Sequence, residues 1–151
     1  DIPEKAISAE INYVTPNGLQ ILQQESANLK SDRAKLIGDD SPSSKQKIMR
    51  IEREIRYYFS RLDSAIVIYP QQQPDDTVLF SARVNVEDSK SKSHIFEIVG
   101  EDEADIKLNK ISYLSPLAKA MIGAKIDDEV KWVKPSGDEY LIINKITYPK
   151  M

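Results

Sequence analysis

Apolar residues in the first half of the chain recur at steps of three and four positions. The first series covers six positions, Leu19, Leu22, Ser26, Leu29, Arg33 and Leu36. The second series covers Ile48, Ile51, Ile55, Tyr58, Leu62 and Ile66. Such spacing places side chains on one face of a helix, and a sustained series is typical of a coiled-coil seam. The pattern predicts one helix over residues 16–37 and a second that ends near residue 66, although Ser26 and Arg33 weaken the first seam.

The segment between the two series is a turn signal. Residues 38–44 read Gly-Asp-Asp-Ser-Pro-Ser-Ser and contain no large apolar side chain. Ser43 or Ser44 is expected to cap the second helix. Two helices that are joined by so short a turn lie antiparallel. We therefore expect an antiparallel coiled-coil hairpin over residues 15–68, preceded by a flexible lead at residues 1–14.

Strand-like segments replace the helical period in the second half, after a linker rich in Pro and Gln at residues 69–75. They occupy residues 78–86, 94–100, 110–112, 129–134 and 139–148, with polar turns between them. One short helix is expected among them. Residues 76–151 therefore predict an antiparallel sheet around one short helix, and the chain as a whole predicts an α+β fold.

The short helix is expected at residues 115–122. Ser115 has the side chain of an N-cap, and Pro116 follows at the first helical position, where its missing N–H leaves no bond unmade. Gly123 can adopt the left-handed conformation after the last turn. The apolar face of this helix is expected to consist of Leu117, Ala120 and Met121.

Composition narrows the function classes. The 151 residues include no Cys and one His, His94, which argues against disulfides, thiolate or histidine metal sites and a Ser-His triad. No apolar run is long enough for a membrane span, and residues 1–10 lack the blocks of a signal peptide, so we expect a cytoplasmic protein without membrane contact. The net charge of −3 argues against a bulk nucleic-acid coat protein. Residues 15–66 are the exception, with nine basic and seven acidic side chains.

Several segments resemble the GreA/GreB transcript-cleavage factors of bacteria. Residues 98–107 (IVGEDEADIK) and 115–130 (SPLAKAMIGAKIDDEV) resemble the C-terminal signature of that family. Residues 51–72 are similar to the second helix and linker of GreB in particular. Gly38 and Asp39 resemble the start of the family's tip motif, Gly-Asp-x-Ser-Glu. The resemblance runs from Thr15 to Tyr148, nearly the whole chain.

The resemblance implies a partner and a mode of action. A C-terminal domain similar to FK506-binding proteins (FKBP-like) docks on the rim of the secondary channel of bacterial RNA polymerase, and the hairpin enters the channel. Acidic residues at its tip, here Asp39 and Asp40, share Mg²⁺ with the polymerase, which hydrolyses the backtracked RNA 3′ end. The factor is then a monomeric accessory protein with no catalytic residue or cofactor of its own.

Two further groups of residues follow from the resemblance. Leu114, Ser115, Pro116 and Lys119 are expected to contact polymerase, with Leu114 where the family commonly has Asp. Arg50, Arg53 and Arg56 step by three along the second helix and could contact the nascent RNA 3′ end or acidic channel walls. The alternative for these arginines is an ordinary solvent face with ion pairs such as Glu52–Arg56.

The tip departs from the family pattern. Pro42 stands where the family has Glu, and Asp40 supplies a second carboxylate beside the first instead of three residues on. The hairpin is also about ten residues shorter before Gly38 and about five shorter after Ser41, which removes roughly 10–15 Å of reach. The alternative for Asp39 and Asp40 is a solvated Asx turn.

Three functions stay open at this point. The favoured one is a polymerase channel binder with weak or no stimulation of transcript cleavage. A fully active GreB-like cleavage factor differs from it only at the tip. A prolyl isomerase or chaperone is the alternative from another class, but the aromatic residues of the C-terminal half lie mostly at strand-core spacing.

Overall fold

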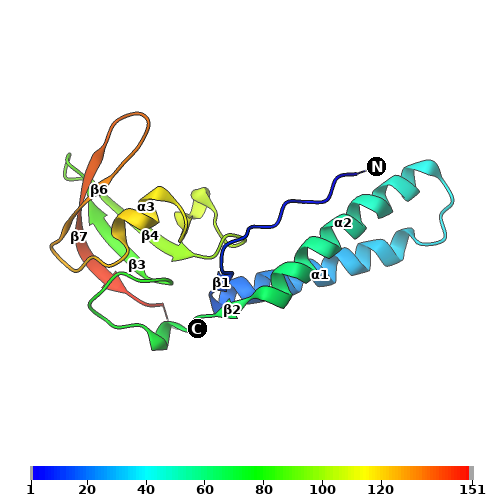
Figure 1. Ribbon diagram of the computed structural model, residues 1–151, viewed down its shortest axis with the longest axis horizontal. Helices are drawn as coiled ribbons and strands as arrows, with labels where there is room; N and C mark the ends of the chain where they lie inside the picture. The colour runs from blue at the N-terminus through cyan, green and yellow to red at the C-terminus, as the bar shows by residue number, and fades with distance from the viewer. Residues whose placement is uncertain (1, 150–151) are drawn as a thin grey trace. The chain divides into compact units, whose positions relative to one another are not determined.

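The computed structural model describes residues 2–149, which fall into two compact units. The first unit contains the chain up to Asn12 together with Leu19–Ile66, and the second contains Tyr13–Gly18 together with the chain from Val67 onward. Figure 1 shows a pair of long helices in the first unit and a sheet with one short helix in the second. The helical N-terminal part and the C-terminal sheet confirm the predicted α+β fold.

Two helices, α1 (Pro16–Leu36) and α2 (Pro42–Ser64), run in opposite directions and are joined by a five-residue turn at residues 37–41. Their bounds agree with the predicted helices to within two residues, apart from the earlier start of α2. Thr15 caps α1, because its Oγ1 accepts the backbone N–H of Gly18 at 2.9 Å. The coiled-coil packing expected of this pair stays a prediction.

The predicted seams are buried or half-buried in both helices, although the two buried residues of α2, Ser44 and Arg61, lie outside its seam. Leu22 and Ser26 of α1 are buried, and the remaining seam positions up to Leu62 are half-buried. Arg33, a charged residue in the first seam, pairs through its Nε with Oε2 of Glu52 on α2 at 2.9 Å. Ile66 was wrongly included in the second seam: α2 ends at Ser64, and Ile66 lies exposed in the short strand β2 (Ile66–Val67).

The start of α2 is capped by Ser41, so the expected cap at Ser43 or Ser44 is wrong. The Oγ of Ser41 accepts the N–H of Ser44 at 3.2 Å, and Pro42 occupies the first helical position. Pro is favoured there because its fixed φ suits the helix and its missing N–H has no helical partner. Ser44 lies in the first turn instead and is buried.

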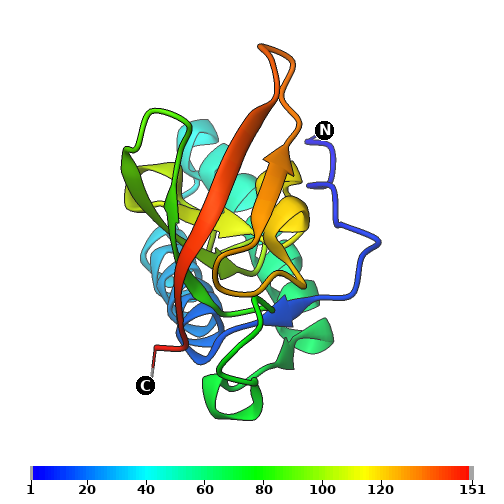
Figure 2. The same ribbon diagram turned by 90° about the vertical axis from the view of Figure 1, so that its left-hand side faces the viewer.

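A five-stranded sheet forms the centre of the second unit (Figures 1 and 2). The order of its strands is β5-β4-β3-β7-β6. Its strands are β3 (Arg83–Glu87), β4 (Ser93–Val99), β5 (Lys110–Ser112), β6 (Glu129–Trp132) and β7 (Glu139–Thr147). The short elements β1 (Tyr13–Val14), η1 (Pro70–Gln72) and η2 (Ile106–Leu108) precede or connect them.

The sheet is mixed, which corrects the expected all-antiparallel arrangement. Neighbours pair antiparallel except β4 and β5, which run parallel with Ile98 opposite Ile111. Parallel neighbours need a crossover instead of a tight hairpin, and residues 100–109 with η2 provide it. The first predicted strand is also shorter than residues 78–86: β3 begins at Arg83, because Ser81 has a φ of 75° that no strand adopts.

The short helix α3 (Pro116–Met121) packs on the core of the sheet. Its Leu117, Ala118 and Met121 join a buried cluster with Val84, Ile98, Leu141, Ile143 and their neighbours. Ala118 is therefore the fully buried alanine, whereas the predicted Ala120 is only half-buried. Gly123 has a φ of 93°, which confirms the left-handed residue expected after the helix.

Candidate functional site

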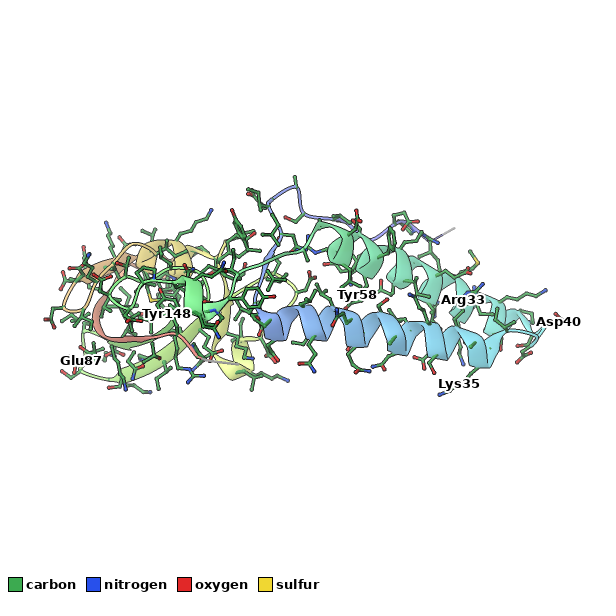
Figure 3. The ribbon with its side chains drawn as sticks, turned by 90° about the horizontal axis from the view of Figure 1, so that it is seen from below. Arg33, Lys35, Asp40, Tyr58, Glu87 and Tyr148 are labelled. Atoms are coloured by element: carbon green, nitrogen blue, oxygen red, sulfur yellow. The ribbon has the colours of Figure 1, made fainter. Side chains whose placement is uncertain are left out.

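The turn of the hairpin holds the two predicted tip acids, with Asp40 at its end (Figure 3). Both carboxylate oxygens of Asp39 accept hydrogen bonds: Oδ1 from the N–H of Ser41 at 2.9 Å, and Oδ2 from the hydroxyl of Ser44 at 2.7 Å. The bond from the Ser41 N–H and then that from the Ser44 hydroxyl lower the pKa of Asp39 below its ordinary value. Asp39 therefore stabilises the start of α2 as an Asx turn.

The tip carries two neighbouring carboxylates, Asp39 and Asp40. Mg²⁺ takes six ligands and is usually held by one or two carboxylates together with water or phosphate oxygens. In residues 2–149, no group of three or more His, Asp or Glu side chains is placed to hold an ion. Asp40 is exposed, whereas the oxygens of Asp39 already accept bonds from within the turn.

The three arginines of α2 that were expected to contact RNA or the channel walls occupy three different environments. Arg50 is exposed to solvent. Arg53 pairs weakly with the adjacent Glu54, Nε to Oε2 at 3.5 Å, and Arg56 pairs with Glu4 of the N-terminal segment at 2.7 Å. The Glu52–Arg56 pair that helical spacing suggested is absent from the described residues, because Glu52 binds Arg33 of α1 instead.

A groove of about 470 Å³ opens beside the N-terminus of α3. Its lining is mostly apolar and includes Phe96, Ile106, Ile111, Pro116, Leu117 and Trp132, together with Ser115. The Oγ of Ser115 accepts the N–H of Ala118 at 3.2 Å, which confirms the predicted cap. The groove thus contains two of the four residues expected to contact polymerase; Leu114 and Lys119 are not in its lining.

Exposed apolar side chains lie on η2 beside this groove. Ile106 is 88% exposed and Leu108 is 64% exposed, which is unusual for large aliphatic residues. Such exposure is typical of an interaction surface when it adjoins an apolar groove. Sequence reasoning did not identify this surface; the available signal was the pair of aliphatic residues around Lys107 in an otherwise polar loop.

The acidic motif before β5 has an internal role. Glu103 is buried, and its carboxylate accepts hydrogen bonds from the hydroxyl of Thr15 at 2.5 Å and from Nδ2 of Asn17 at 2.7 Å. Nζ of Lys110 lies 3.5 Å from Oε2 of Glu103, and its positive charge compensates the buried carboxylate. A Cβ on Gly100 would lie 2.5 Å from the carbonyl oxygen of Tyr13. The motif therefore fixes residues 13–17 to the rest of the second unit, to which they belong.

His94 and Asp88 form a partly exposed pair at the start of β4. Nε2 of His94 lies 2.9 Å from Oδ2 of Asp88, and its ring stacks on Phe96. The hydrogen bond from His94, followed by the N–H of Lys92, lowers the pKa of Asp88 to about 2. His94 lies in a strand as expected, and its side chain is half-buried and hydrogen-bonded to Asp88.

Comparison with known proteins identifies the family. The sequence model described as "Transcription elongation factor, GreA/GreB, C-term" matches residues 73–148, half of the chain. The GreA of Zymomonas mobilis is 37% identical over 145 residues, which cover 87% of this chain and 92% of that protein. The chain belongs to the GreA/GreB family. The GreB of Neisseria meningitidis serogroup A is 34% identical over 156 residues, which cover 93% of this chain and 96% of the relative.

The solved structures compared here that bear names of this family are less similar in sequence than these relatives. The "Prokaryotic transcription elongation factor GreA/GreB from Nitrosomonas europaea" is 20% identical and gives a TM-score of 0.45, covering 91% of this chain and 99% of that one. The family assignment therefore rests on the sequence comparisons. In this GreA/GreB-family chain, no helix within residues 2–149 is long and apolar enough to cross a membrane.

Proposed function

We propose that this protein is a transcription elongation factor that binds bacterial RNA polymerase, inserts its hairpin into the secondary channel and stimulates transcript cleavage weakly or not at all. The membership in the GreA/GreB family supports the partner, since relatives of similar length carry the name of elongation factors. The division into a helical hairpin and a sheet unit suits one part that enters a channel and another that docks. The protein is then an accessory to the polymerase active site and not an enzyme by itself.

The second unit is the part that docks. An apolar surface of polymerase can fill the groove at Ser115 and Pro116. Binding would then bury Ile106 and Leu108, which lie at the edge of the groove. These side chains now expose apolar area to water, and its removal on binding is favourable. The groove also lies inside the matched family segment, residues 73–148.

One observation carries the expectation of weak cleavage. Each carboxylate oxygen of Asp39 already accepts one hydrogen bond, from Ser41 or Ser44, which ties the carboxylate to the turn and leaves it fewer lone pairs for a metal ion. The arm is also short, since α1 spans only 21 residues, roughly 30 Å at 1.5 Å per residue. Because a catalytic group displaced by about 1 Å can lower a rate by about 100-fold, a short arm whose first acid is tied into the turn supports little activity.

The cleavage claim is tested on backtracked elongation complexes with Mg²⁺ and a gel that resolves shortened RNA. The wild type is compared with an Asp39→Ala, Asp40→Ala double variant. We expect both to leave the RNA nearly uncut at concentrations that saturate polymerase. Robust cleavage by the wild type that disappears in the double variant would identify a fully active GreB-like factor instead.

The docking claim has its own matched pair of variants. Ile106→Asp places a charge on the rim of the groove, whereas Ile126→Asp makes the same change at a 49% exposed isoleucine outside its lining. We expect the Ile106 variant to lose affinity for polymerase, measured by surface binding to the immobilised enzyme, while the Ile126 variant stays close to wild type. Equal affinities of the two variants for polymerase would show that the groove is not part of the interface.

A further inference from the structure

A cavity of about 220 Å³ in the second unit has no part in the proposed function. Strands β3, β4 and β5 line it together with residues 15–17, and its lining lies entirely within that unit. Its wall combines three prolines with four charged side chains, Arg83, Glu97, Glu103 and Lys110. At about 30 Å³ per water molecule, the cavity has room for about seven waters or for one small metabolite. A small polar ligand is therefore the class that fits.

Three of the charged side chains form a row across neighbouring strands. Arg83 of β3 lies opposite Glu97 of β4, and Glu97 in turn lies opposite Lys110 of β5. Residues that are opposite each other project from the same face of a sheet, and neighbouring strands are about 4.8 Å apart. The row therefore places a positive, a negative and a second positive charge side by side along one wall of the cavity.

The row retains hydrogen-bonding groups that the fold does not use. Nε and Nη2 of Arg83 both donate to Oε1 of Glu97, which leaves Oε2 of Glu97 without a hydrogen bond within residues 2–149. Arg83 has five N–H donors, so most of them stay available. The ammonium of Lys110 lies 3.5 Å from Oε2 of Glu103, too far for a strong hydrogen bond. The row can therefore offer a ligand both donors and an acceptor.

Ser81 adds a buried hydroxyl to the same cavity. Ser81 is 5% exposed and belongs to the lining, and its Oγ has no hydrogen-bond partner in the described part of the chain. Its φ of 75° is uncommon for a serine. A buried polar atom without a partner is costly, and such atoms are rare in folded proteins. The hydroxyl of Ser81 therefore indicates that the cavity is built to hold a polar occupant.

We propose that this cavity binds a free α-amino acid, with its carboxylate on Arg83 and the hydroxyl of Ser81 and its ammonium on Oε2 of Glu97. A bare anion of the same size would be repelled by the free oxygen of Glu97, and a bare cation by Arg83 and Lys110. A zwitterion avoids both penalties, because each of its charges faces an opposite one. The site needs neither the hairpin nor polymerase, so its test is independent of the proposed function.

The experiment titrates the full chain with glycine and with L-alanine at neutral pH and follows the backbone amide signals by NMR. Acetate and methylamine are the matched half-ligands, because each carries only one of the two charges. We expect both amino acids to shift the signals of Ser81, Arg83 and Glu97 in a saturable way. At the same ionic strength, acetate and methylamine should bind about tenfold more weakly or less, since each lacks one charge-assisted hydrogen bond.

The hydroxyl of Ser81 is tested by its removal. Ser81→Ala should lower the affinity for L-alanine about tenfold, because a hydrogen bond to the carboxylate of the ligand is lost. The unfolding midpoint without ligand should stay at the wild-type value, since the hydroxyl has no partner among the described residues. Ser91→Ala is the matched control: Ser91 also has a positive φ, 61°, but it is exposed and lies outside the lining.

Glu97→Gln tests the preference for a zwitterion. It exchanges the carboxylate for a neutral amide of the same shape. This variant should bind L-alanine more weakly and acetate more tightly than the wild type does, because the group that attracts the ammonium also repels an anion. A purely structural role of Glu97 would not change the affinities for the two probes in opposite directions.

Three results would overturn the proposal. Unchanged signals of Ser81 and Arg83 with both amino acids would leave ordered water as the occupant of the cavity. Acetate that binds to the wild type as tightly as L-alanine would identify a simple anion site instead. Equal affinities of Ser81→Ala and Ser91→Ala for L-alanine would show that the hydroxyl does not contact the ligand.

Discussion

Removal of the Ser115 hydroxyl should weaken the second unit by about 1 kcal/mol, the typical effect of losing an N-cap. The Oγ of Ser115 accepts the N–H of Ala118 at 3.2 Å, and without it that N–H has no partner in the helix. A less stable α3 also weakens the packing of the core, because α3 contributes Leu117, Ala118 and Met121 to the buried cluster. For a unit of this size, a loss of about 1 kcal/mol lowers the unfolding midpoint by about 4–8 °C.

The assay uses the single tryptophan of the chain. Trp132 packs against the core of the second unit, so its fluorescence reports on that unit during heating. Ser41→Ala is the matched control: it removes the equivalent cap of α2 and should lower the helix signal in circular dichroism while the Trp132 midpoint stays constant. Ser115→Asp should recover most of the loss, since Asp is also a good N-cap. An unchanged Trp132 midpoint in Ser115→Ala would refute the reasoning.

Three further changes test the fold by thermal or denaturant unfolding. Gly100→Ala should destabilise the protein by about 1–3 kcal/mol, because its Cβ would collide with the carbonyl of Tyr13; wild-type stability would contradict this. Ile143→Ala, at a fully buried position of β7, should cost about 2–5 kcal/mol in urea unfolding, and a loss within error would place Ile143 outside the core. The pKa of Asp88 is lowered from 3.8 to about 2, so its stabilisation is present above pH 3.8 and disappears as the pH falls towards 2. Asp88→Asn should remove this dependence, and a carboxyl NMR titration with a midpoint at the ordinary value would contradict it.

Local signals in the sequence were sufficient for most elements of the fold. The steps of three and four predicted both helices, and the Ser115-Pro116 pair predicted the start of α3. Each of these signals depends on neighbours along the chain, through helical periodicity or a cap within three residues. The cap of α2 was misplaced because three serines compete in residues 41–44, and the position of Pro42 decides between them.

Contacts between distant residues could not be predicted in the same way. Glu103 finds its partners Thr15 and Asn17 more than 80 positions away. The alternative for Arg56 was an ion pair with Glu52 at helical spacing, but Glu4 binds Arg56 instead, and Glu52 binds Arg33 across the hairpin. Exposed charges have several partners of similar energy, so tertiary placement selects among them. The groove beside α3 likewise arises from η2, β4, β5 and β6, which no local pattern brings together.

The most direct test of the central claim is a competition on backtracked elongation complexes. An authentic Gre factor cleaves the RNA at a fixed concentration, and this protein is added in increasing amounts. We predict that cleavage falls towards the level without any factor, because this protein occupies the secondary channel with a short arm and an altered acidic tip. Cleavage that stays constant at saturating protein would contradict binding at the shared site, and cleavage that increases would contradict the weak-cleavage assignment.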